Sequence, residues 1–387
     1  MKKIFLILPI LFLLTGCYNY RELNDLAIVS GISITKEENT YKVTAEVVNP
    51  KKQQDTSSSK EPDFIIYTSS ANSMQEAFRK VIKESPRKLY LAQMDILIID
   101  EKVAEEELNT ILDFIARDPE VRSEFYVLIG KIDKILEVTT PLENISSKNI
   151  LESLKANNMY LGYANLITYH ELINDYLNPN IEIALPSIEV TGNPKEGEDI
   201  KNIESTTEDA SSVISNIGIF KNNKLLGYLS EKESLVYNLV MGNTQTTLIK
   251  TNYQNNQYVV NEIIDSSVKT EADPKNNKIT ISIKGKSAIS EVNYDCDLEK
   301  KKTIEDIQKK LNETIEDTIK NSIEDTILKY NSDIYGFLDL FYKKDPKYYK
   351  TIKDEWYEKI FPNLEIEVKS KIEIIEKGNL NGGLYHE

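Results

Sequence analysis

Cysteine and histidine are nearly absent from this chain of 387 residues, which has two of each. The cysteines are Cys17 and Cys296, and the histidines are His170 and His386. Two cysteines are too few for a disulfide-stabilised scaffold. The same small set cannot supply a zinc site of the Cys/His type, and a histidine-based catalytic triad has at most one plausible base. These shortages exclude most zinc enzymes and small disulfide-rich domains.

Positive charge is also scarce. The sequence has 47 Lys and Arg residues against 62 Asp and Glu residues, which gives a net charge of −15. This balance argues against nucleic-acid binding, which depends on neutralising phosphates. Apolar residues make up 40% of the chain and charged residues 28%, as in a globular protein able to bury a core. At roughly 100–200 residues per domain, the length predicts two or three domains.

Motifs for common catalytic chemistry are missing as well. The sequence contains no G-x-G-x-x-G, no P-loop, no H-E-x-x-H and no G-x-S-x-G. His170 lies on a predicted helix without a nearby nucleophile, and Cys296 has acidic neighbours that disfavour a reactive thiolate. Acidic pairs such as Glu105–Glu107 and Glu316–Asp317 lack the order of a calcium loop, so we interpret them as hydrated helix faces. We therefore expect a protein that is not an enzyme and has no cofactor or metal ion.

The first seventeen residues resemble a bacterial lipoprotein signal. Two lysines precede an apolar run, Ile4–Leu14, which is too short to span a bilayer as a helix but suits a secretory signal. The run ends in Leu-Thr-Gly-Cys, which is similar to a lipobox, where the signal is cut before the cysteine and the thiol receives a diacylglyceryl group. We therefore predict removal of residues 1–16 and lipidation of Cys17. The alternative is an ordinary signal peptide with an incidental cysteine.

Cys17 is expected to be the only membrane attachment. Removal of residues 1–16 takes away two lysines and leaves a net charge of −17. So acidic a body does not adhere to anionic lipid unaided. No later apolar run approaches the twenty residues of a membrane-spanning helix. Two or more acyl chains on Cys17 are enough for stable anchoring.

The patterns of apolar residues predict two α+β regions separated by a linker. Residues 17–190 alternate predicted strands and helices, and residues 191–211 form a polar linker rich in Gly, Pro, Lys, Glu and Ser. The predicted strands of the first region are 26–35, 41–48, 63–68, 89–99, 124–129 and 181–190, and its clearest helices are 73–82 and 101–117. Residues 212–387 form the second region.

The second region is predicted to contain the longest helix of the chain. Its first strands, 212–220 and 224–229, form a hairpin through Asn222 and Asn223, which tolerate positive φ. A helix over about 298–330 has one apolar stripe with spacings of three and four residues. A helix lying across a sheet explains this stripe better than a coiled coil, because strict 3-4 alternation is missing. The last strand, 364–374, alternates apolar and charged residues, as in an antiparallel sheet with one hydrated face.

Several segments along the chain resemble the C subunits of spore-germination receptors, the Ger(x)C lipoproteins. The first is C-Y-N-Y-R-E-L-N-D-L-A-I-V at residues 17–29, directly after the lipobox. Further segments follow in the family's order at residues 86–90, 98–101, 117–122, 218–221, 224–227 and 333–337, with Trp356 and Phe361-Pro362 near the end. The resemblance covers the whole mature chain, and the order of the segments is more specific than any one of them.

The resemblance implies a non-enzymatic, lipid-anchored receptor subunit. Such a protein lies on the outer face of the spore inner membrane, beside integral-membrane A and B subunits, in a complex that responds to nutrient germinants. The family's body is elongated and α+β, with three domains, so residues 17–190 are expected to divide near residue 132. We predict an elongated multi-domain α+β fold of mixed, largely antiparallel sheets with packed helices.

Two other functions remain open from the residues alone. One is a solute-binding lipoprotein of a transporter, which predicts regular βαβ halves around a hinge. The other is a structural surface lipoprotein with no receptor role. The short charged segment after the lipid either solubilises a tether or contacts the membrane subunits. For the second reading we predict Arg21, Glu22 and Asp25 as partner-binding residues, because they lie within eight residues of Cys17.

Overall fold

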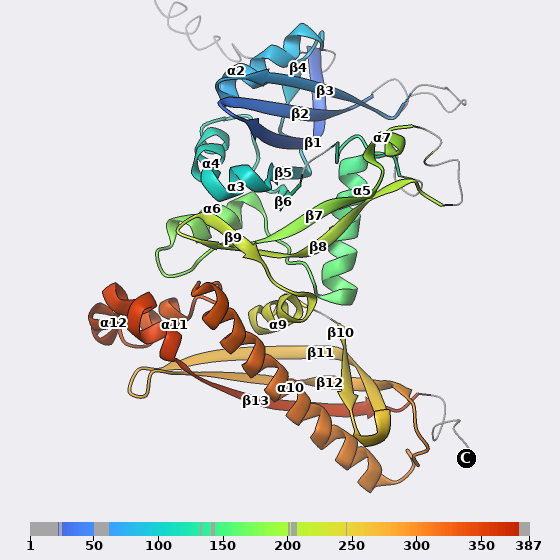
Figure 1. Cartoon of the computed structure of the whole chain (residues 1–387), viewed down its shortest axis with the longest axis vertical. Coiled ribbons are helices and arrows are strands. Elements are labelled where there is room, and N and C mark those ends of the chain that lie inside the picture. The colour runs from blue at the N-terminus through green and yellow to red at the C-terminus, as the bar shows by residue number, and fades with distance from the viewer. Residues whose placement is uncertain are drawn as a thin grey trace, which may run out of the picture.

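The molecule is elongated, with two β-sheets arranged one after the other along its long axis (Figure 1). This computed structural model describes residues 22, 25–49, 62–131, 134–140, 144–199, 202, 207–244 and 246–378. The predicted signal peptide, the predicted lipidation site Cys17 and the predicted partner-binding residue Arg21 lie outside the described residues. The fold class is the predicted α+β class with mixed sheets.

The first sheet has nine strands. The order is β3-β2-β1-β5-β6-β7-β8-β9, and β4 pairs with the start of β1. The strands are β1 (Leu26–Glu37), β2 (Thr40–Val48), β3 (Phe64–Ala71), β4 (Lys88–Tyr90), β5 (Ile96–Asp100), β6 (Tyr126–Gly130), β7 (Ala184–Gly192), β8 (Ala210–Lys221) and β9 (Lys224–Tyr228). The central strands β1, β5, β6 and β7 are parallel, whereas the outer pairs are antiparallel. Antiparallel hairpins therefore extend a parallel centre on both sides.

Helices cover both faces of the first sheet. The residues of β5 alternate between two cores, because successive side chains of a strand point to opposite faces. Leu97 and Ile99 belong to one core, Ile96 and Ile98 to the other, and all four are fully buried. The surrounding helices are α2 (Met74–Lys80), η2 (Val81–Lys83), α3 (Glu101–Glu106), α4 (Leu108–Ala116), α5 (Ser146–Ala156), η3 (Asn157–Leu161), α6 (Tyr169–Leu177) and α7 (Pro194–Gly197).

The helix predicted over residues 101–117 is interrupted at Glu107. Its backbone leaves the helical region there, with φ −140° and ψ 29°, so α3 and α4 form separately. The Glu107 carboxylate accepts hydrogen bonds from the Lys36 ammonium and the Tyr41 hydroxyl. Our interpretation of Glu105–Glu107 as a hydrated face is therefore wrong for Glu107. The partners of this carboxylate come from the strands β1 and β2, about 70 positions earlier in the chain.

The segment predicted as a linker, residues 191–211, connects two paired strands of one sheet. β7 and β8 pair from Ala184↔Ile219 to Gly192↔Ala210, and α7 lies between them. Asn202 ties this connection down, because its buried side chain donates to the carbonyls of Thr139 and Ala210 at 2.8 and 3.0 Å. The hairpin predicted at residues 212–229 also forms, but it extends the first sheet. The division of the chain into domains stays a prediction.

The second sheet has four strands in the order β10-β11-β12-β13. These are β10 (Thr247–Asn252), β11 (Tyr258–Asp273), β12 (Lys278–Val292) and β13 (Glu365–Glu376). The first three are antiparallel neighbours, whereas β13 runs parallel to β12. The helices of this region are α9 (Glu231–Met241), η4 (Gln254–Asn256), α10 (Lys301–Tyr330), α11 (Phe337–Lys344), α12 (Pro346–Ile352), η5 (Lys353–Glu355), η6 (Trp356–Ile360) and η7 (Phe361–Asn363).

Helix α10 lies across one face of the second sheet, as its apolar stripe predicts (Figure 1). The stripe is buried from Ile307 to Ile327, and only Ile304 at its start is half-buried. Its members pack against Ile279, Ile281 and Ile283 of β12, whose period of two presents one face of the strand to the helix. The alternative coiled-coil interpretation finds no support in this packing.

Polar side chains of α10 also cover the free edge of β13. The backbone N–H groups of Ser370, Ile372 and Ile374 donate to the side-chain oxygens of Glu316, Asn312 and Gln308, at 2.8, 2.7 and 2.9 Å. Residues four apart on a helix rise about 6 Å, and residues two apart on a strand about 6.6 Å, so the two rows stay in step. Our interpretation of Glu316 as part of a hydrated face is wrong, because it is half-buried against this edge.

Candidate interaction sites

Glu22 and Asp25 are the predicted partner-binding residues that the structure describes. Both are exposed, and the Asp25 N–H donates to the Glu22 carbonyl oxygen at 3.0 Å in the turn before β1. Leu26 then pairs with Lys88 at the start of the parallel β1–β4 ladder. The chain therefore enters the body at the end where β3 and β4 lie (Figure 1).

Charged residues from two distant segments meet next to this entry point. The Lys88 ammonium contacts both carboxylate oxygens of Glu120, at 2.6 and 2.7 Å. Arg117, at the end of α4, forms a two-pronged ion pair with Asp113, with both distances 2.8 Å. These side chains line a groove of about 760 Å³ between α2, β4 and α4. Each cation in it is already paired, and Asp118 adds a third carboxylate, so the groove offers aromatic and apolar surface with a slight excess of negative charge.

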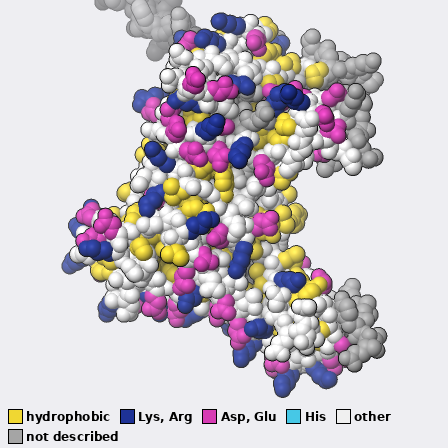
Figure 2. Space-filling model, viewed as in Figure 1, with side chains coloured by type: hydrophobic (Ala, Val, Ile, Leu, Met, Phe, Trp, Pro, Cys, Tyr) yellow, Lys and Arg dark blue, Asp and Glu magenta, His cyan; other side chains and the backbone are white. Residues whose placement is uncertain are grey.

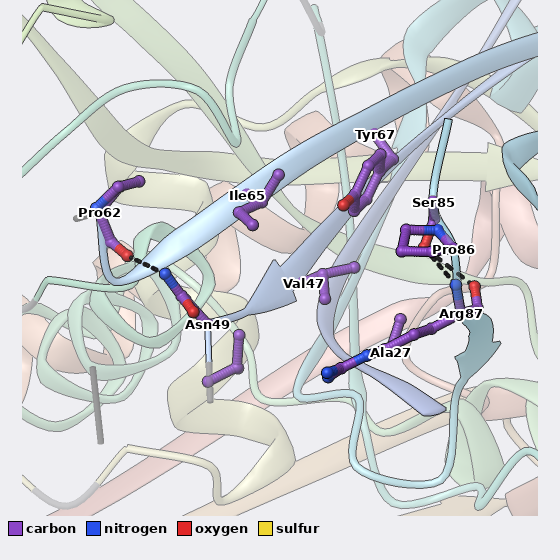
Figure 3. A pocket seen from close by; sticks show the side chains of 10 residues that line it. Ala27, Val47, Asn49, Pro62, Ile65, Tyr67, Ser85, Pro86 and Arg87 are labelled. Carbon is purple, nitrogen blue, oxygen red and sulfur yellow. Dashed lines mark hydrogen bonds between the residues drawn. The ribbon is translucent and has the colours of Figure 1, made fainter. Parts of the chain in front are cut away.

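A second pocket, of about 370 Å³, lies on the other side of β4. Figure 3 shows that its walls come from the start of β1, the end of β2, the first half of β3 and residues 85–87 just before β4. Val47, Ile65 and Tyr67 give it an apolar wall, and Arg87 lies along the side of Ala27. Within the described part of the chain, no carboxylate forms an ion pair with the Arg87 guanidinium. This pocket therefore combines apolar surface with one uncompensated positive charge.

A buried carboxylate fixes α5 to the first sheet. Glu46 of β2 is fully buried, and it accepts hydrogen bonds from the Ser30 hydroxyl at 2.8 Å and the Ser147 N–H at 3.1 Å. Ser147 lies in the first turn of α5, where unpaired N–H groups favour a negative charge. Burial nevertheless raises the pKa of Glu46, because desolvation outweighs these donors. The sequence gives no signal for this role, since Glu46 stands in an ordinary strand pattern.

The junction between the two sheets is polar and buried. The Lys221 ammonium donates to the Asn331 carbonyl at 2.7 Å and lies 4.4 Å from the Tyr357 ring centroid. Glu182 accepts from the Asn222 N–H at 2.9 Å and from the Tyr357 hydroxyl at 3.1 Å. These contacts join the β8–β9 turn and the segment before β7 to the end of α10 and to η6. The first sheet is thus tied to the C-terminal helices by specific hydrogen bonds.

Asp333 is the most strongly perturbed carboxylate of this junction. It is fully buried and accepts hydrogen bonds from the N–H groups of Phe337 and Leu338, at 2.9 and 2.8 Å, at the start of α11. Its own carbonyl accepts from the Glu182 N–H at 3.0 Å. Burial raises the pKa of Asp333 to about 7. Burial also raises the pKa of Glu182 and lowers that of Lys221, because desolvation disfavours each charged form.

The residues considered for catalysis are not brought together. His170 is exposed on α6, and its ring nitrogen lies 3.3 Å from the Asn174 side chain. Cys296 is a free, half-buried thiol beside Tyr253 and Tyr294, in a separate apolar cluster. The described residues contain no group of three or more metal-ligating side chains. Among them, no helix is both long and apolar enough to cross a membrane.

Charge on the visible face is mixed. Figure 2 shows Lys and Arg interspersed with Asp and Glu along the length of the body, with no broad basic area on this side. This face therefore lacks the basic patch that is typical of nucleic-acid-binding proteins.

Comparisons with known proteins assign this fold. Two family models match successive parts of the chain: "Spore germination protein N-terminal domain" over residues 19–190, and "Spore germination B3/GerAC like, C-terminal" over residues 215–378. Together they cover nearly all of the chain after the predicted signal.

The chain belongs to the Ger(x)C family of spore germination proteins.

Relatives from Bacillus subtilis (strain 168) share most of the Ger(x)C chain. Spore germination protein KC is 27% identical over 99% of this chain and 97% of the relative. Spore germination protein B3 is 24% identical over 73% of this chain and 72% of the relative. The crystal structure of the GerBC protein matches with a TM-score of 0.50 at 18% identity, over 89% of this chain and 97% of that one. This structural likeness supports the fold.

Several of the Ger(x)C segments recognised in the sequence gather at two places in the structure. Residues 86–90 and 117–122 meet at the groove and pocket beside the chain's entry point. Residues 218–221, 333–337 and 356–362 meet at the junction between the sheets, where the Ser332 hydroxyl also donates to the Phe220 carbonyl at 2.5 Å. The segments are recognisable in the sequence. The hydrogen-bonding roles of Glu46 and Glu182 are not, because most of their partners lie far away in the chain.

Proposed function

We propose that this Ger(x)C protein is the lipid-anchored, non-enzymatic C subunit of a nutrient germinant receptor. A lipid on Cys17 holds it to the outer face of the spore inner membrane, beside integral-membrane A and B subunits. The observation that carries this proposal is a full-length match to a germination family combined with the Leu-Thr-Gly-Cys sequence before residue 18.

The position of the chain's entry point supports this arrangement. Eight residues separate Cys17 from Asp25, and an extended chain covers about 26–29 Å over that length. The end of the body that carries β3, β4 and both N-terminal pockets is thus kept close to the bilayer. The junction and the second sheet extend away from that end along the long axis (Figure 1). Arg21, Glu22 and Asp25 accordingly stand where extracytoplasmic loops of membrane subunits are within reach.

The solute-binding alternative receives little support from the fold. A periplasmic-type binding protein has two βαβ lobes that close on a ligand across a hinge. Here the parallel strands β1, β5, β6 and β7 belong to one sheet, and the second sheet is built from a long antiparallel hairpin with β13 added in parallel. The two N-terminal pockets described above lie at one end of the first sheet, away from the junction between the sheets.

Membrane partitioning of a cysteine variant tests the anchor. We expect Cys17→Ala either to keep its signal peptide uncleaved or, once cleaved, to be released from membranes by high salt in cells that lack the A and B subunits, because no acyl chains remain. The matched control is Cys296→Ala, which removes the other thiol and should partition like the wild type. Normal partitioning of cleaved Cys17→Ala under these conditions would disprove the lipid anchor.

A second arm of the same experiment tests the partners. Arg21→Glu should lower recovery of the A and B subunits in detergent, because an interfacial ion pair broken on one side typically costs about 2–5 kcal/mol. Lipidation and the melting temperature should stay unchanged. The control is Arg79→Glu, which makes the same charge change at an exposed position on α2. If Arg21→Glu retains full co-isolation and normal germination, this segment is only a tether.

A further inference from the structure

β3 is an open edge of the first sheet. Its register with β2 continues one step beyond the strand, where the Asn49 N–H donates to the Asp63 carbonyl at 2.8 Å. In an antiparallel pair, hydrogen-bonded and non-hydrogen-bonded residue pairs alternate. The N–H and C=O groups of odd-numbered β3 residues therefore face β2, and those of Phe64, Ile66, Thr68 and Ser70 face outward.

Most of these outward groups have no partner. The Ser70 carbonyl accepts a hydrogen bond from the Lys80 ammonium at 3.4 Å, at the end of the strand that α2 flanks. For Phe64, Ile66 and Thr68, the backbone N–H and C=O groups make no hydrogen bond in the described part of the protein. An edge of this kind is a template for pairing with another strand.

The composition of β3 makes this edge unusual. The strand reads F-I-I-Y-T-S-S-A, with no charge, no proline and no glycine over eight residues. Natural sheets normally protect such an edge with lysine, proline, a bulge or a covering element. The edge of β13 shows that protection in this same molecule, because side chains of α10 occupy its N–H groups. β3 thus combines high strand propensity with an accessible backbone.

The adjoining pocket continues the same surface. Ile65 and Tyr67 of β3 line the 370 Å³ pocket together with Arg87, and Ile65 is 38% exposed. Figure 3 shows the β3 side chains and Arg87 on the pocket wall, with Ala27 of β1 close to Arg87. Ala27 is ten residues after Cys17, so this surface lies within about 36 Å of the lipidated residue.

We propose that β3 is a docking edge for an extended segment of a membrane-embedded partner subunit, which adds a strand to the first sheet. Backbone hydrogen bonds to Phe64, Ile66 and Thr68 supply general affinity, and the pocket beside Ile65 takes a side chain of the added strand. A carboxylate on that segment pairs with Arg87. This inference rests on the proposed function, because it needs a partner in the membrane.

Charge favours such a partner over a second copy of this chain. Two copies paired through β3 would bring together two bodies that each carry a net charge of −15 before processing. Like net charges of this size oppose close association. An apolar segment of a membrane subunit with one acidic residue meets no such repulsion at the uncharged strand and finds a partner in Arg87.

Co-isolation of full-length, lipidated protein with tagged A and B subunits tests the proposal. Thr68→Pro removes an outward N–H without breaking the β2–β3 ladder, because proline is tolerated where an edge strand's N–H faces solvent. Loss of one hydrogen bond should weaken recovery of the partners by roughly 3- to 10-fold. The control Thr68→Val also loses the hydroxyl that lies 3.2 Å from the Thr44 hydroxyl, but it keeps the N–H and should co-isolate normally.

A second variant leaves the β3 backbone unchanged. Ile65→Lys places a charge in the pocket wall beside Arg87 and should also reduce co-isolation. Leu248→Lys makes the same change at an exposed strand position of the second sheet, where Leu248 is 57% exposed, and should have no effect. Equal recovery with Ile65→Lys and Leu248→Lys would overturn the docking edge.

Amide hydrogen exchange gives an independent readout. In the isolated protein in detergent, the amides of Phe64, Ile66 and Thr68 should exchange quickly, whereas those of Ile65 and Tyr67 are slow. In the complex, all five should be slow. Unchanged exchange at the three outward amides in a complex that retains A and B would overturn this inference and leave the proposed function standing.

Two other outcomes also count against the proposal. Failure of the wild type to recover A and B would contradict the proposed function, and the docking inference would fall with it. A stable dimer of the purified protein that Thr68→Pro dissociates would show that the occupant of the edge is a second copy.

Discussion

The two sheets of this Ger(x)C protein end in edge strands of opposite character. At β13, a helix runs alongside the strand and its side chains Gln308, Asn312 and Glu316 take up the free N–H groups. At β3, the outward groups of Phe64, Ile66 and Thr68 stay free within the described residues. The chain therefore has the means to close an edge and uses them at β13 but, among the described residues, not at Phe64, Ile66 and Thr68 of β3. The edge that can pair with another strand is therefore β3, at the end of the body where the chain enters it.

The same contrast extends to the faces of the sheets. The first sheet is buried on both faces, and its central strand β5 belongs to two cores. The second sheet is covered by α9, α10 and α11 on one face only, and its other face carries cross-strand pairs such as Lys278–Glu367 at 2.9 Å. The second sheet therefore has its apolar core on one side only, and α10 supplies the longest apolar stripe of that core.

The largest effect is expected from breaking the α10 core. Ile315 is 4% exposed at the middle of the stripe. Ile315→Asp loses its apolar burial and places an unpaired carboxylate there, so the free energy of unfolding should fall by about 4 kcal/mol or more. Fluorescence of Trp356, the only tryptophan, reports this loss in a denaturant titration because it is buried in the same core. Asp317→Asn on the exposed face should change stability little, and equal shifts would contradict the assigned face.

A smaller effect is expected from opening the β13 edge alone. Asn312 accepts from the Ile372 N–H at 2.7 Å and the Ser370 hydroxyl at 2.6 Å, and it donates to the Ile372 carbonyl at 3.0 Å. Asn312→Ala should cost about 2 kcal/mol, because half-buried backbone groups lose their partners. The Ile372 amide should then exchange faster, as we also expect of the β3 edge amides. Glu313→Ala, one position away on the exposed face, is the control. A slow Ile372 amide in Asn312→Ala would show that another group protects this edge.

The junction between the two sheets should give stability a pH dependence. Asp333 has a pKa of about 7 in the folded protein, against about 3.9 for an unperturbed aspartate. Between these values the folded state binds the extra proton, so the free energy of unfolding falls as pH rises. The decrease between pH 6 and pH 7 is about 1 kcal/mol. Asp333→Asn should flatten this slope in thermal melts, and an unchanged slope would assign it to other groups.

The smallest effect is expected at the open edge. Ile65→Lys should change the free energy of unfolding by less than about 0.5 kcal/mol, because the side chain is 38% exposed and the strand backbone is unaffected. Ile66→Lys should cost more, since Ile66 packs against the core on the α5 side. Denaturant midpoints of the two variants distinguish the two faces of β3. A large loss in Ile65→Lys would show that β3 is needed for folding rather than kept accessible.

Local periodicity was enough to predict most elements of this protein. The alternation of apolar residues predicts the strands near β1, β5 and β12, and the stripe from Ile304 to Ile327 predicts α10 across a sheet. The hairpin turn is confirmed by positive φ angles of 50° and 63° at Asn222 and Asn223. These features are predictable because strands and helices have fixed repeats, and asparagine tolerates the left-handed region. The resemblance to the family added the expectation of an elongated shape.

Only the tertiary structure decided which elements share a sheet and which polar groups meet. The sequence alone predicts a linker at residues 191–211, yet the strands on either side of it, β7 and β8, pair with each other. Hydrogen bonds from the Asn202 side chain hold the connection between them in place. Glu107, Glu182 and Glu316 look like ordinary charged positions, but their partners lie between 40 and 175 positions away. Local patterns of apolar residues predict whether a segment is a helix or a strand and which of its faces is buried. Helix α10 covers the edge of β13, whereas no described element covers the edge of β3 in the same way. Both outcomes depend on how segments far apart in the chain pack together, which a short stretch of sequence cannot show.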